Sequence, residues 1–203
     1  TVYKFTPVKD IEVTSVKDQA RTGTCWCFAT LSFLEAELIR QGKGVYDFSE
    51  MFVVRHNYNK RINDNYLRLG RGNVGPGSLS HMAVNAIVEY GIVPESVYDG
   101  IEYGSDKHNH GELSAFVKAI SEVIVQRKER SPEYWKVQEH LFDTYLGKLP
   151  EEFEYNGKKY TPKSFAAMLG LDDLSDYVEI TSFTHHPFYR QVPLEIPDNW
   201  DHQ

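Results

Sequence analysis

A cysteine and a glutamine six residues apart are the residues of this chain best suited to chemistry. Gln19 precedes Gly23 and Thr24, and Cys25 then opens a segment whose apolar residues recur at helical spacing. A helix N-terminus has unpaired N–H groups and a partial positive charge, which stabilise a thiolate, the reactive form of cysteine. The glutamine amide can donate to the oxygen that becomes negative when a thiolate attacks a carbonyl, a contact worth about 3–4 kcal/mol in enzymes that use one. The pattern therefore predicts a nucleophile beside an oxyanion donor.

An amphipathic helix is expected to position Cys25 at its N-terminus. The apolar residues recur at three- and four-residue spacing over about four turns, and they are Phe28, Leu31, Leu34, Leu38 and Ile39. Gly42 and Gly44 then end the helical pattern. A helix with this apolar stripe is buried by the elements around it, so a residue at its end is rigidly positioned.

Two more helices are expected in the first half of the chain. Ser49 can cap a helix that runs to about Asn59, and Ser78 or Ser80 can cap a helix that ends at Gly91. The glycine-rich segment between these two helices predicts a loop.

The composition changes at Gly104, and charged helical segments continue to about Asp176. The expected elements are helices over 112–130 and 132–146, a hairpin around Asn156-Gly157, and a short helix that opens at Thr161-Pro162 and ends at Gly170. Residues 177–183 are the best strand candidate, because they are rich in β-branched and aromatic side chains.

The composition of the 203-residue chain disfavours several classes of protein. A net charge of −7 opposes binding to a polyphosphate backbone, so nucleic acid is not expected as a partner. No apolar run approaches the roughly 18 residues that cross a bilayer, so no membrane span is expected. Cys25 and Cys27 are too close together to link distant parts of the chain, which favours a reducing compartment. A cytoplasmic location is therefore expected, and a periplasmic or exported one stays open because the chain begins without methionine.

The stretch from Val16 to Ala29 resembles the active-site segment of the papain-like cysteine peptidases. That family has a Val-Lys-(Asn/Asp)-Gln stretch, then Cys-Gly-Ser-Cys-Trp and an aromatic-rich helix. The matching stretches here are Val16-Lys17-Asp18-Gln19 and Gly23-Thr24-Cys25-Trp26-Cys27-Phe28-Ala29. The resemblance implies that Cys25 is the nucleophile and that Gln19 donates to the oxyanion, together with the backbone N–H of Cys25. The alternative for Cys25 is a buried structural thiol, and Cys27 is expected to face the core.

Two more segments support the resemblance, in the order that the family has them. Phe48-Ser49-Glu50 is similar to the Leu-Ser-Glu that opens the family's next helix. The segment from Gly77 to Tyr90-Gly91 is similar to its Gly-Gly loop, helix and Tyr-Gly turn. In the family this loop pairs with the backbone of the bound peptide, which implies that Gly77, Ser78 and Trp26 lie at substrate-binding positions. Ser78 replaces the second glycine, and its Cβ is expected to narrow the cleft.

Departures from the papain pattern resemble the bleomycin hydrolase and aminopeptidase C branch. Thr22 occupies the place of a cysteine that forms a disulfide in secreted relatives, and a long helical insertion precedes the second lobe. The branch implies an α+β, papain-like two-lobe fold. Its parts are a helical N-terminal lobe over 1–104, a helical insertion with a short hairpin over 105–176, and the start of the β lobe over 177–203. Most of the β-barrel lobe is expected to be missing from this chain.

The catalytic histidine and asparagine of the family are expected beyond Gln203. The family has an Asn-Ser-Trp-Gly segment, which this sequence lacks. His185 and His186 are alternatives for the histidine, but Pro187 breaks the strand that such a residue should begin. His108-Asn109-His110 is expected in a solvated loop. No metal or other cofactor is expected, because no third ligand accompanies these histidines at a recognisable spacing.

The resemblance implies a cysteine-type peptidase, and by its branch an aminopeptidase, that hydrolyses peptide substrates through a thiolate and an acyl-enzyme. The 203-residue chain alone is expected to be inactive without its histidine. One alternative is a catalytically incomplete peptide-binding protein or pseudopeptidase on the same fold, and another is an acyltransferase that uses the same cysteine chemistry. The branch also implies a homo-oligomer, with the charged insertion helices as contact surfaces.

Overall fold

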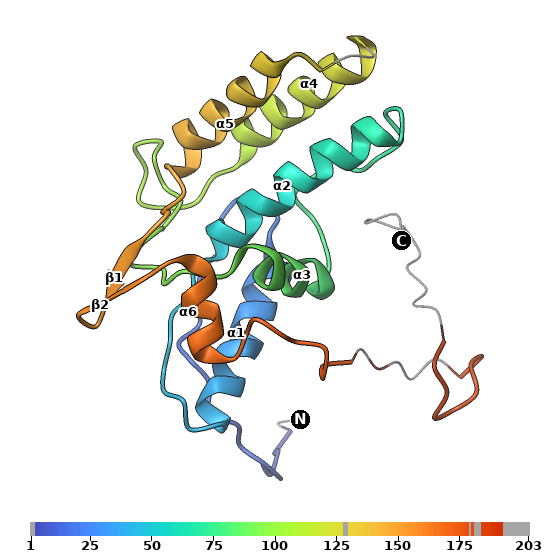
Figure 1. Cartoon of the computed structure of the whole chain (residues 1–203). Coiled ribbons are helices and arrows are strands. Elements are labelled where there is room, and N and C mark those ends of the chain that lie inside the picture. The colour runs from blue at the N-terminus through green and yellow to red at the C-terminus, as the bar shows by residue number, and fades with distance from the viewer. Residues whose placement is uncertain (1–2, 128–129, 179, 181–183, 193–203) are drawn as a thin grey trace.

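The computed structural model describes residues 3–127, 130–178, 180 and 184–192. The elements are α1 (Cys25–Arg40), α2 (Glu50–Leu67), α3 (Ser80–Tyr90), α4 (Gly111–Arg127), α5 (Pro132–Leu146), β1 (Phe153–Tyr155), β2 (Lys158–Tyr160) and α6 (Pro162–Leu169). The strands form an antiparallel hairpin in which Phe153 pairs with Tyr160, and helices form the rest of the regular structure (Figure 1). Helices with one small sheet are the architecture expected for the helical lobe and its insertion.

Helix α1 is the element around which the others pack. Helices α2 and α3 lie against it (Figure 1). Leu31, Leu34 and Leu38 are buried, and each contributes roughly 2 kcal/mol by leaving water. The expected extent of this helix is confirmed, because it begins at Cys25 and ends just before Gly42. Cys25 therefore begins a helix that the hydrophobic core holds in place.

Helix α2 is longer than the sequence predicted. Ser49 caps it as expected, and its side chain accepts a hydrogen bond from a backbone N–H of the first turn at 3.1 Å. The expected end near Asn59 is wrong, because the helix continues to Leu67. Its second half packs against α4 and α5, where the Asn65 amide donates to the Ser121 hydroxyl at 2.6 Å. Contacts with the insertion thus stabilise a segment whose own helical signal is weak.

Helix α3 begins without the side-chain cap that the sequence predicted. Ser80 is its first residue and Leu79 occupies the N-cap position, so neither Ser78 nor Ser80 caps the helix. Ser78 is buried in the loop that leads into it. Burial stabilises the helix instead, and the buried residues are Met82, Ala83, Ala86 and Ile87.

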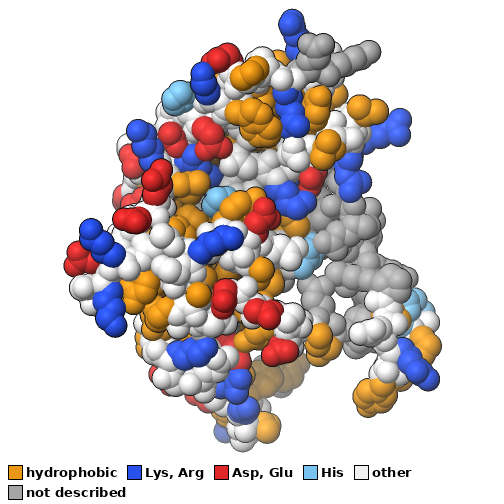
Figure 2. Space-filling model, viewed as in Figure 1, with side chains coloured by type: hydrophobic (Ala, Val, Ile, Leu, Met, Phe, Trp, Pro, Cys, Tyr) orange, Lys and Arg blue, Asp and Glu red, His pale blue; other side chains and the backbone are white. Residues whose placement is uncertain are grey.

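The surface on the face seen in Figure 2 carries acidic, basic and apolar side chains interspersed with one another. This face therefore offers no continuous basic area to a polyanion. Large apolar side chains are exposed at several places, among them Phe33 on α1 and Phe116 on α4. No helix in the described ranges is long and apolar enough to cross a membrane.

The insertion helices α4 and α5 form a pair that lies along α2 (Figure 1). Arg55 on α2 is buried, and its guanidinium donates to the carboxylates of Glu139 and Asp143 on α5, both at 2.7 Å. It also donates to the backbone carbonyl of Gly147. The Tyr98 hydroxyl donates to the same carbonyl at 3.3 Å. The end of α5 is therefore joined to the helical lobe by charged and neutral hydrogen bonds.

The hairpin and α6 form as their local sequences predict. Asn156 and Gly157 have φ values of 51° and 74°, as the two central residues of a type I′ turn require. Thr161 caps α6, because its hydroxyl accepts the Ser164 N–H at 3.1 Å. Gly170 ends the helix in the left-handed conformation, with φ of 72°.

The strand expected over 177–183 does not form where it can be assessed. Tyr177, Val178 and Ile180 have no strand assignment, and residues 179 and 181–183 lie outside the described residues. In the described part of the chain the hairpin is the only strand ladder, so these residues have no neighbouring strand to pair with.

Candidate active site

Cys25 is exposed at the first position of α1. Thr24 occupies the N-cap position, but its side chain makes no capping hydrogen bond. Its hydroxyl lies 2.6 Å from the Thr22 hydroxyl instead. The Thr24 side chain therefore caps no N–H group at this helix end, whose partial positive charge can stabilise an anionic sulfur or oxygen at Cys25.

Thr22 orders the segment that joins Gln19 to Cys25. Its buried hydroxyl donates to the backbone carbonyl of Gln19 at 3.0 Å, so Thr24 donates to Thr22 in the 2.6 Å contact between them. The Thr24 N–H also points to the Thr22 hydroxyl, at 3.3 Å. Sequence reasoning noted Thr22 only as the place of an absent disulfide cysteine. The Thr-x-Thr spacing before the cysteine is the signal that could have indicated this role.

Gln19 is half-buried beside this turn. Its side-chain oxygen is buried without a hydrogen-bond partner among the described residues. The next residue, Ala20, has φ of 48°, and its N–H donates to the Asp18 carboxylate at 2.8 Å. The backbone conformation around Gln19 is thus fixed on one side by Asp18 and on the other by Thr22.

Trp26 connects the first turn of α1 to the loop that precedes α3. Its indole N–H donates to the Pro76 carbonyl at 2.9 Å, and the side chain is buried. Gly23 lies at the same contact, because a Cβ on Gly23 would be 2.9 Å from Pro76 Cγ. The structure therefore brings Gly77 and Ser78, which follow Pro76, next to the turn of Cys25. Trp26 positions this loop, a role that fits its expected place in the substrate-binding region.

A cluster of charges, mostly buried, holds the segment that leads to Gln19. The Lys17 ammonium donates to Glu35 at 2.8 Å and Glu50 at 3.0 Å, and it pairs with Asp47 at 2.6 Å. Burial by itself would lower the pKa of Lys17, but the hydrogen bonds to Asp47 and Glu35 raise it above its ordinary value. Burial raises the pKa of Glu50 to about 7. Burial also raises the pKa of Glu95 to about 8, and the nearby carboxylates of Glu50 and Asp47 act in the same direction.

Sequence reasoning did not identify this Lys17 cluster, because its acids are far apart along the chain. Lys17 and Glu35 are separated by 18 residues, and Lys17 and Glu50 by 33. The cluster joins the segment before Gln19 to α1 and α2, which supports the position of Gln19.

The insertion begins in contact with the active-site segment. Arg21 pairs with Asn109 in an isolated bridge, in which the Arg21 N–H donates to the His108 carbonyl at 3.1 Å. The His110 N–H donates back to the Arg21 carbonyl at 2.9 Å. The expectation of a solvated loop is wrong, because the bridge directs His108 and His110 into the protein, where both are buried. Burial lowers the pKa of His110 to about 4, and His108 adds to the effect.

His185 and His186 are the late histidines that the sequence offers for the catalytic role. His185 is exposed, and the segment that contains His185 and His186, red in Figure 1, lies away from the helices. The described residues also contain no group of three or more potential ligands that could hold a metal ion.

A groove of about 320 Å³ lies between α1, the start of α3 and residues 174–178. Ala29 and Phe33 follow Cys25 at four-residue spacing, so they share its face of the helix, and both line the groove. The opposite wall includes Val84 on α3 and Tyr177. This groove on α1 is therefore mainly apolar.

A family model described as "Papain family cysteine protease" matches residues 4–150. The chain therefore belongs to the papain family of cysteine proteases, which confirms the resemblance and the fold class inferred from the sequence. Cys25, Gln19 and the Gly77–Ser78 loop all lie within the matched residues.

Curated relatives include two bacterial aminopeptidases. Aminopeptidase W of Lactobacillus delbrueckii subsp. lactis and Aminopeptidase E of Lactobacillus helveticus are each 24% identical to this chain, over 94% of it and 52% of their own length. Cysteine proteinase 2 of Entamoeba histolytica is 27% identical over 75% of this chain and 46% of its own length. The chain spans about half the length of the curated relatives it matches.

Proposed function

We propose that Cys25 is the nucleophile of a peptidase that cleaves peptide bonds through an acyl-enzyme. The observation that carries this proposal is the exposure of Cys25 at the uncapped N-terminus of a buried helix, in a chain of the papain family. The ordered turn from Gln19 to Cys25 supports it, because catalysis by a nucleophile requires a fixed geometry.

In the proposed reaction the Cys25 sulfur attacks the carbonyl carbon of the scissile peptide bond. A carbon–sulfur bond forms and the carbonyl π electrons move to the oxygen, to which the Gln19 amide and the Cys25 N–H donate hydrogen bonds. The carbon–nitrogen bond then breaks, and the amine leaves with a proton from an imidazolium. Water then attacks the thioester and gives a proton to the imidazole, and the carbon–sulfur bond breaks, which releases the acid and restores the thiolate and the imidazolium. We expect this imidazole from a histidine outside the described residues.

We further propose that the peptidase is an aminopeptidase. The relatives named Aminopeptidase W and Aminopeptidase E match 94% of this chain. The loop at Gly77 and Ser78 would pair with the backbone of the substrate on the acyl side. Ser78 has a Cβ where a glycine would have none, so the cleft at this loop admits less of the substrate.

The reactivity of the two cysteines tests the proposed nucleophile, because their environments differ. Cys27 is fully buried, its thiol donates to the Glu50 carbonyl at 3.5 Å, and burial raises its pKa well above the ordinary value. We expect a peptidyl epoxide, incubated with the full-length gene product at neutral pH, to label Cys25 and leave Cys27 unmodified. Peptide hydrolysis should disappear in parallel with the labelling. Failure of Cys25 to react in a folded sample would contradict a peptidase and favour a peptide-binding pseudopeptidase.

We also propose a compartment for the protein, a surface for its self-association and a division of the chain into units. Two free thiols and no disulfide among the described residues fit a reducing, cytoplasmic setting. Exposed apolar side chains on α4 and α5, such as Phe116 and Trp135, are candidate contacts for a homo-oligomer. The units 1–104, 105–176 and 177–203 remain our proposed division of the chain.

A further inference from the structure

A hollow of about 480 Å³ lies beside the segment that carries Gln19. One wall consists of Asp18, Ala20 and Arg21, and the other includes Lys107, His108 and Asn109 at the start of the insertion. We refer to it as the Arg21 hollow.

Backbone hydrogen bonds fix the two walls of the Arg21 hollow. The Arg21 N–H donates to the His108 carbonyl at 3.1 Å, and the His110 N–H donates to the Arg21 carbonyl at 2.9 Å. The His108 ring meets Phe28 of α1 edge-on, with ring centroids 6.2 Å apart. The hollow is therefore preformed, and the side chain of Arg21 can be replaced without removing these backbone bonds.

The side chains of the Arg21 hollow carry more positive than negative charge. Arg21 and Lys107 are exposed, and within the described ranges neither side chain has a hydrogen-bond or ion-pair partner. Asp18 opposes them, but one of its oxygens accepts the Ala20 N–H. His108 is only 9% exposed, and its Nδ1 atom is buried without a hydrogen-bond partner in the same part of the chain. Two exposed cations without a partner favour an anionic ligand.

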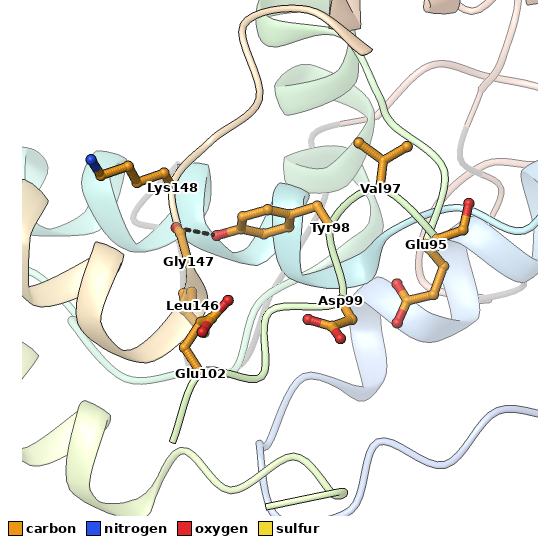
Figure 3. A pocket seen from close by; sticks show the side chains of 9 residues that line it. Glu95, Val97, Tyr98, Asp99, Glu102, Leu146, Gly147 and Lys148 are labelled. Atoms are coloured by element: carbon orange, nitrogen blue, oxygen red, sulfur yellow. Dashed lines mark hydrogen bonds between the residues drawn. The ribbon is translucent and has the colours of Figure 1, made fainter. Parts of the chain in front are cut away.

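Another hollow, of about 420 Å³, has an excess of negative side chains, and we refer to it as the Glu95 hollow. Glu95, Asp99 and Glu102 line it together with a single cation, Lys148 (Figure 3). The chain as a whole has a net charge of −7, so the positive excess at the Arg21 hollow is a local feature. The Glu95 hollow also provides a matched place for a control substitution.

The Arg21 hollow borders one end of the segment from Gln19 to Cys25. The loop at Gly77 and Ser78 borders the other end. A Cβ on Gly23 would be 2.9 Å from Pro76 Cγ, so the Gly23 end adjoins the loop at Gly77. The Arg21 end adjoins the hollow. Under the proposed function, the loop at Gly77 pairs with the acyl portion of the substrate. Gln19, whose neighbours Asp18 and Ala20 line the hollow, donates to the scissile carbonyl. The portion that leaves as the amine then extends toward the Arg21 hollow.

We propose that the Arg21 hollow binds a carboxylate on the leaving portion of the peptide substrate. Arg21 and Lys107 are its charge partners. The carboxylate belongs either to an acidic side chain or to the free C-terminus of the peptide. This inference rests on the proposed peptidase function. An aminopeptidase releases everything after the first residue, so the leaving portion contains most of the sequence that the enzyme can recognise.

Three peptides with the same first residue test this inference in the full-length gene product. One has a neutral leaving portion and an amidated C-terminus, the second adds a glutamate to that portion, and the third is neutral with a free C-terminus. We expect kcat/KM for one of the carboxylate peptides to exceed that of the neutral peptide about fivefold at low salt, as exposed charge pairs allow. The preferred peptide identifies the source of the carboxylate. The preference should decrease as salt is added.

Substitutions test whether Arg21 and Lys107 cause the preference for a carboxylate peptide. Arg21→Gln and Lys107→Gln should each lower the ratio of kcat/KM values, and the double variant should bring it to one. Lys148→Gln makes the same charge change in the Glu95 hollow and should keep the wild-type ratio. Circular dichroism checks that each variant is folded.

Two results would overturn the inference. Equal kcat/KM for all three peptides in the wild type would do so, as would a preference that survives in the double variant. In both cases hydrolysis of the neutral peptide would still support the proposed function. Absence of hydrolysis of all three peptides would overturn both proposals.

Discussion

Replacing Thr22 with valine tests whether its hydroxyl orders the segment between Gln19 and Cys25. Valine has nearly the shape of threonine, so the change removes a polar atom and little volume. The Thr22 hydroxyl donates to the Gln19 carbonyl at 3.0 Å and lies 2.6 Å from the Thr24 hydroxyl. The Thr24 hydroxyl would lose a buried hydrogen bond and the Gln19 carbonyl a partly buried one, at about 1–3 kcal/mol for each unsatisfied group. We therefore expect Thr22→Val to lower the free energy of unfolding by about 2–4 kcal/mol.

Urea denaturation measures this loss, and Thr144→Val on α5 is the matched control. The Thr144 hydroxyl donates to the His140 carbonyl at 2.7 Å on the exposed surface, so its loss should change the free energy of unfolding by less than about 0.5 kcal/mol. Because Thr22 also positions Gln19, kcat/KM of the full-length gene product should fall about tenfold in Thr22→Val, equivalent to 1.4 kcal/mol of transition-state stabilisation. Equal stability and equal kcat/KM in the two valine variants would refute the reasoning.

Three further predictions concern the surroundings of the site. The pKa values of Glu50, about 7, and Glu95, about 8, lie above those of an unfolded chain, so the folded protein holds more protons and loses stability as pH rises through these values. Urea denaturation should show a loss of about 2–3 kcal/mol between pH 6.5 and 8.5, and Glu95→Gln should remove most of that slope; an unchanged slope would contradict it. Trp26→Phe removes the hydrogen bond to Pro76, so kcat/KM for a peptide should fall more than the rate at which iodoacetamide alkylates the active-site thiol. Equal effects on both rates would show that the indole does not position the substrate loop. Arg55→Met leaves two carboxylates of α5 without their cation, and thermal unfolding should show a loss of about 2–3 kcal/mol, against no loss if α5 is held by packing alone.

The sequence predicted the elements whose signals are local. The spacing of Leu31, Leu34 and Leu38 predicted α1, and Asn156-Gly157 predicted the hairpin turn. The cysteine, the glutamine and the residues around them were enough to infer the family, which the match over residues 4–150 confirms. Short-range rules suffice here because helix periodicity, turns and caps depend on neighbouring residues.

The sequence did not predict the features that depend on distant contacts. The second half of α2 is stabilised as a helix by its contacts with α4 and α5. The spacing of residues within α2 carries no information about these contacts. The burial of His108 and His110 follows from a bridge to Arg21, far away in the chain. The Lys17 cluster likewise joins acids from separate segments. These contacts hold the segment that carries Gln19 and Cys25. The sequence could therefore propose the candidate residues, but it could not predict the contacts that support them.

Trapping the covalent intermediate tests the central proposal most directly. The full-length gene product would be mixed with a peptide substrate, quenched in acid within milliseconds to seconds, and digested for mass spectrometry. We expect the acyl portion of the substrate to be attached as a thioester to the peptide that contains Cys25, and Cys25→Ser to abolish both this thioester and hydrolysis. Hydrolysis that proceeds in Cys25→Ser, or an acyl group found on a different residue, would contradict the account.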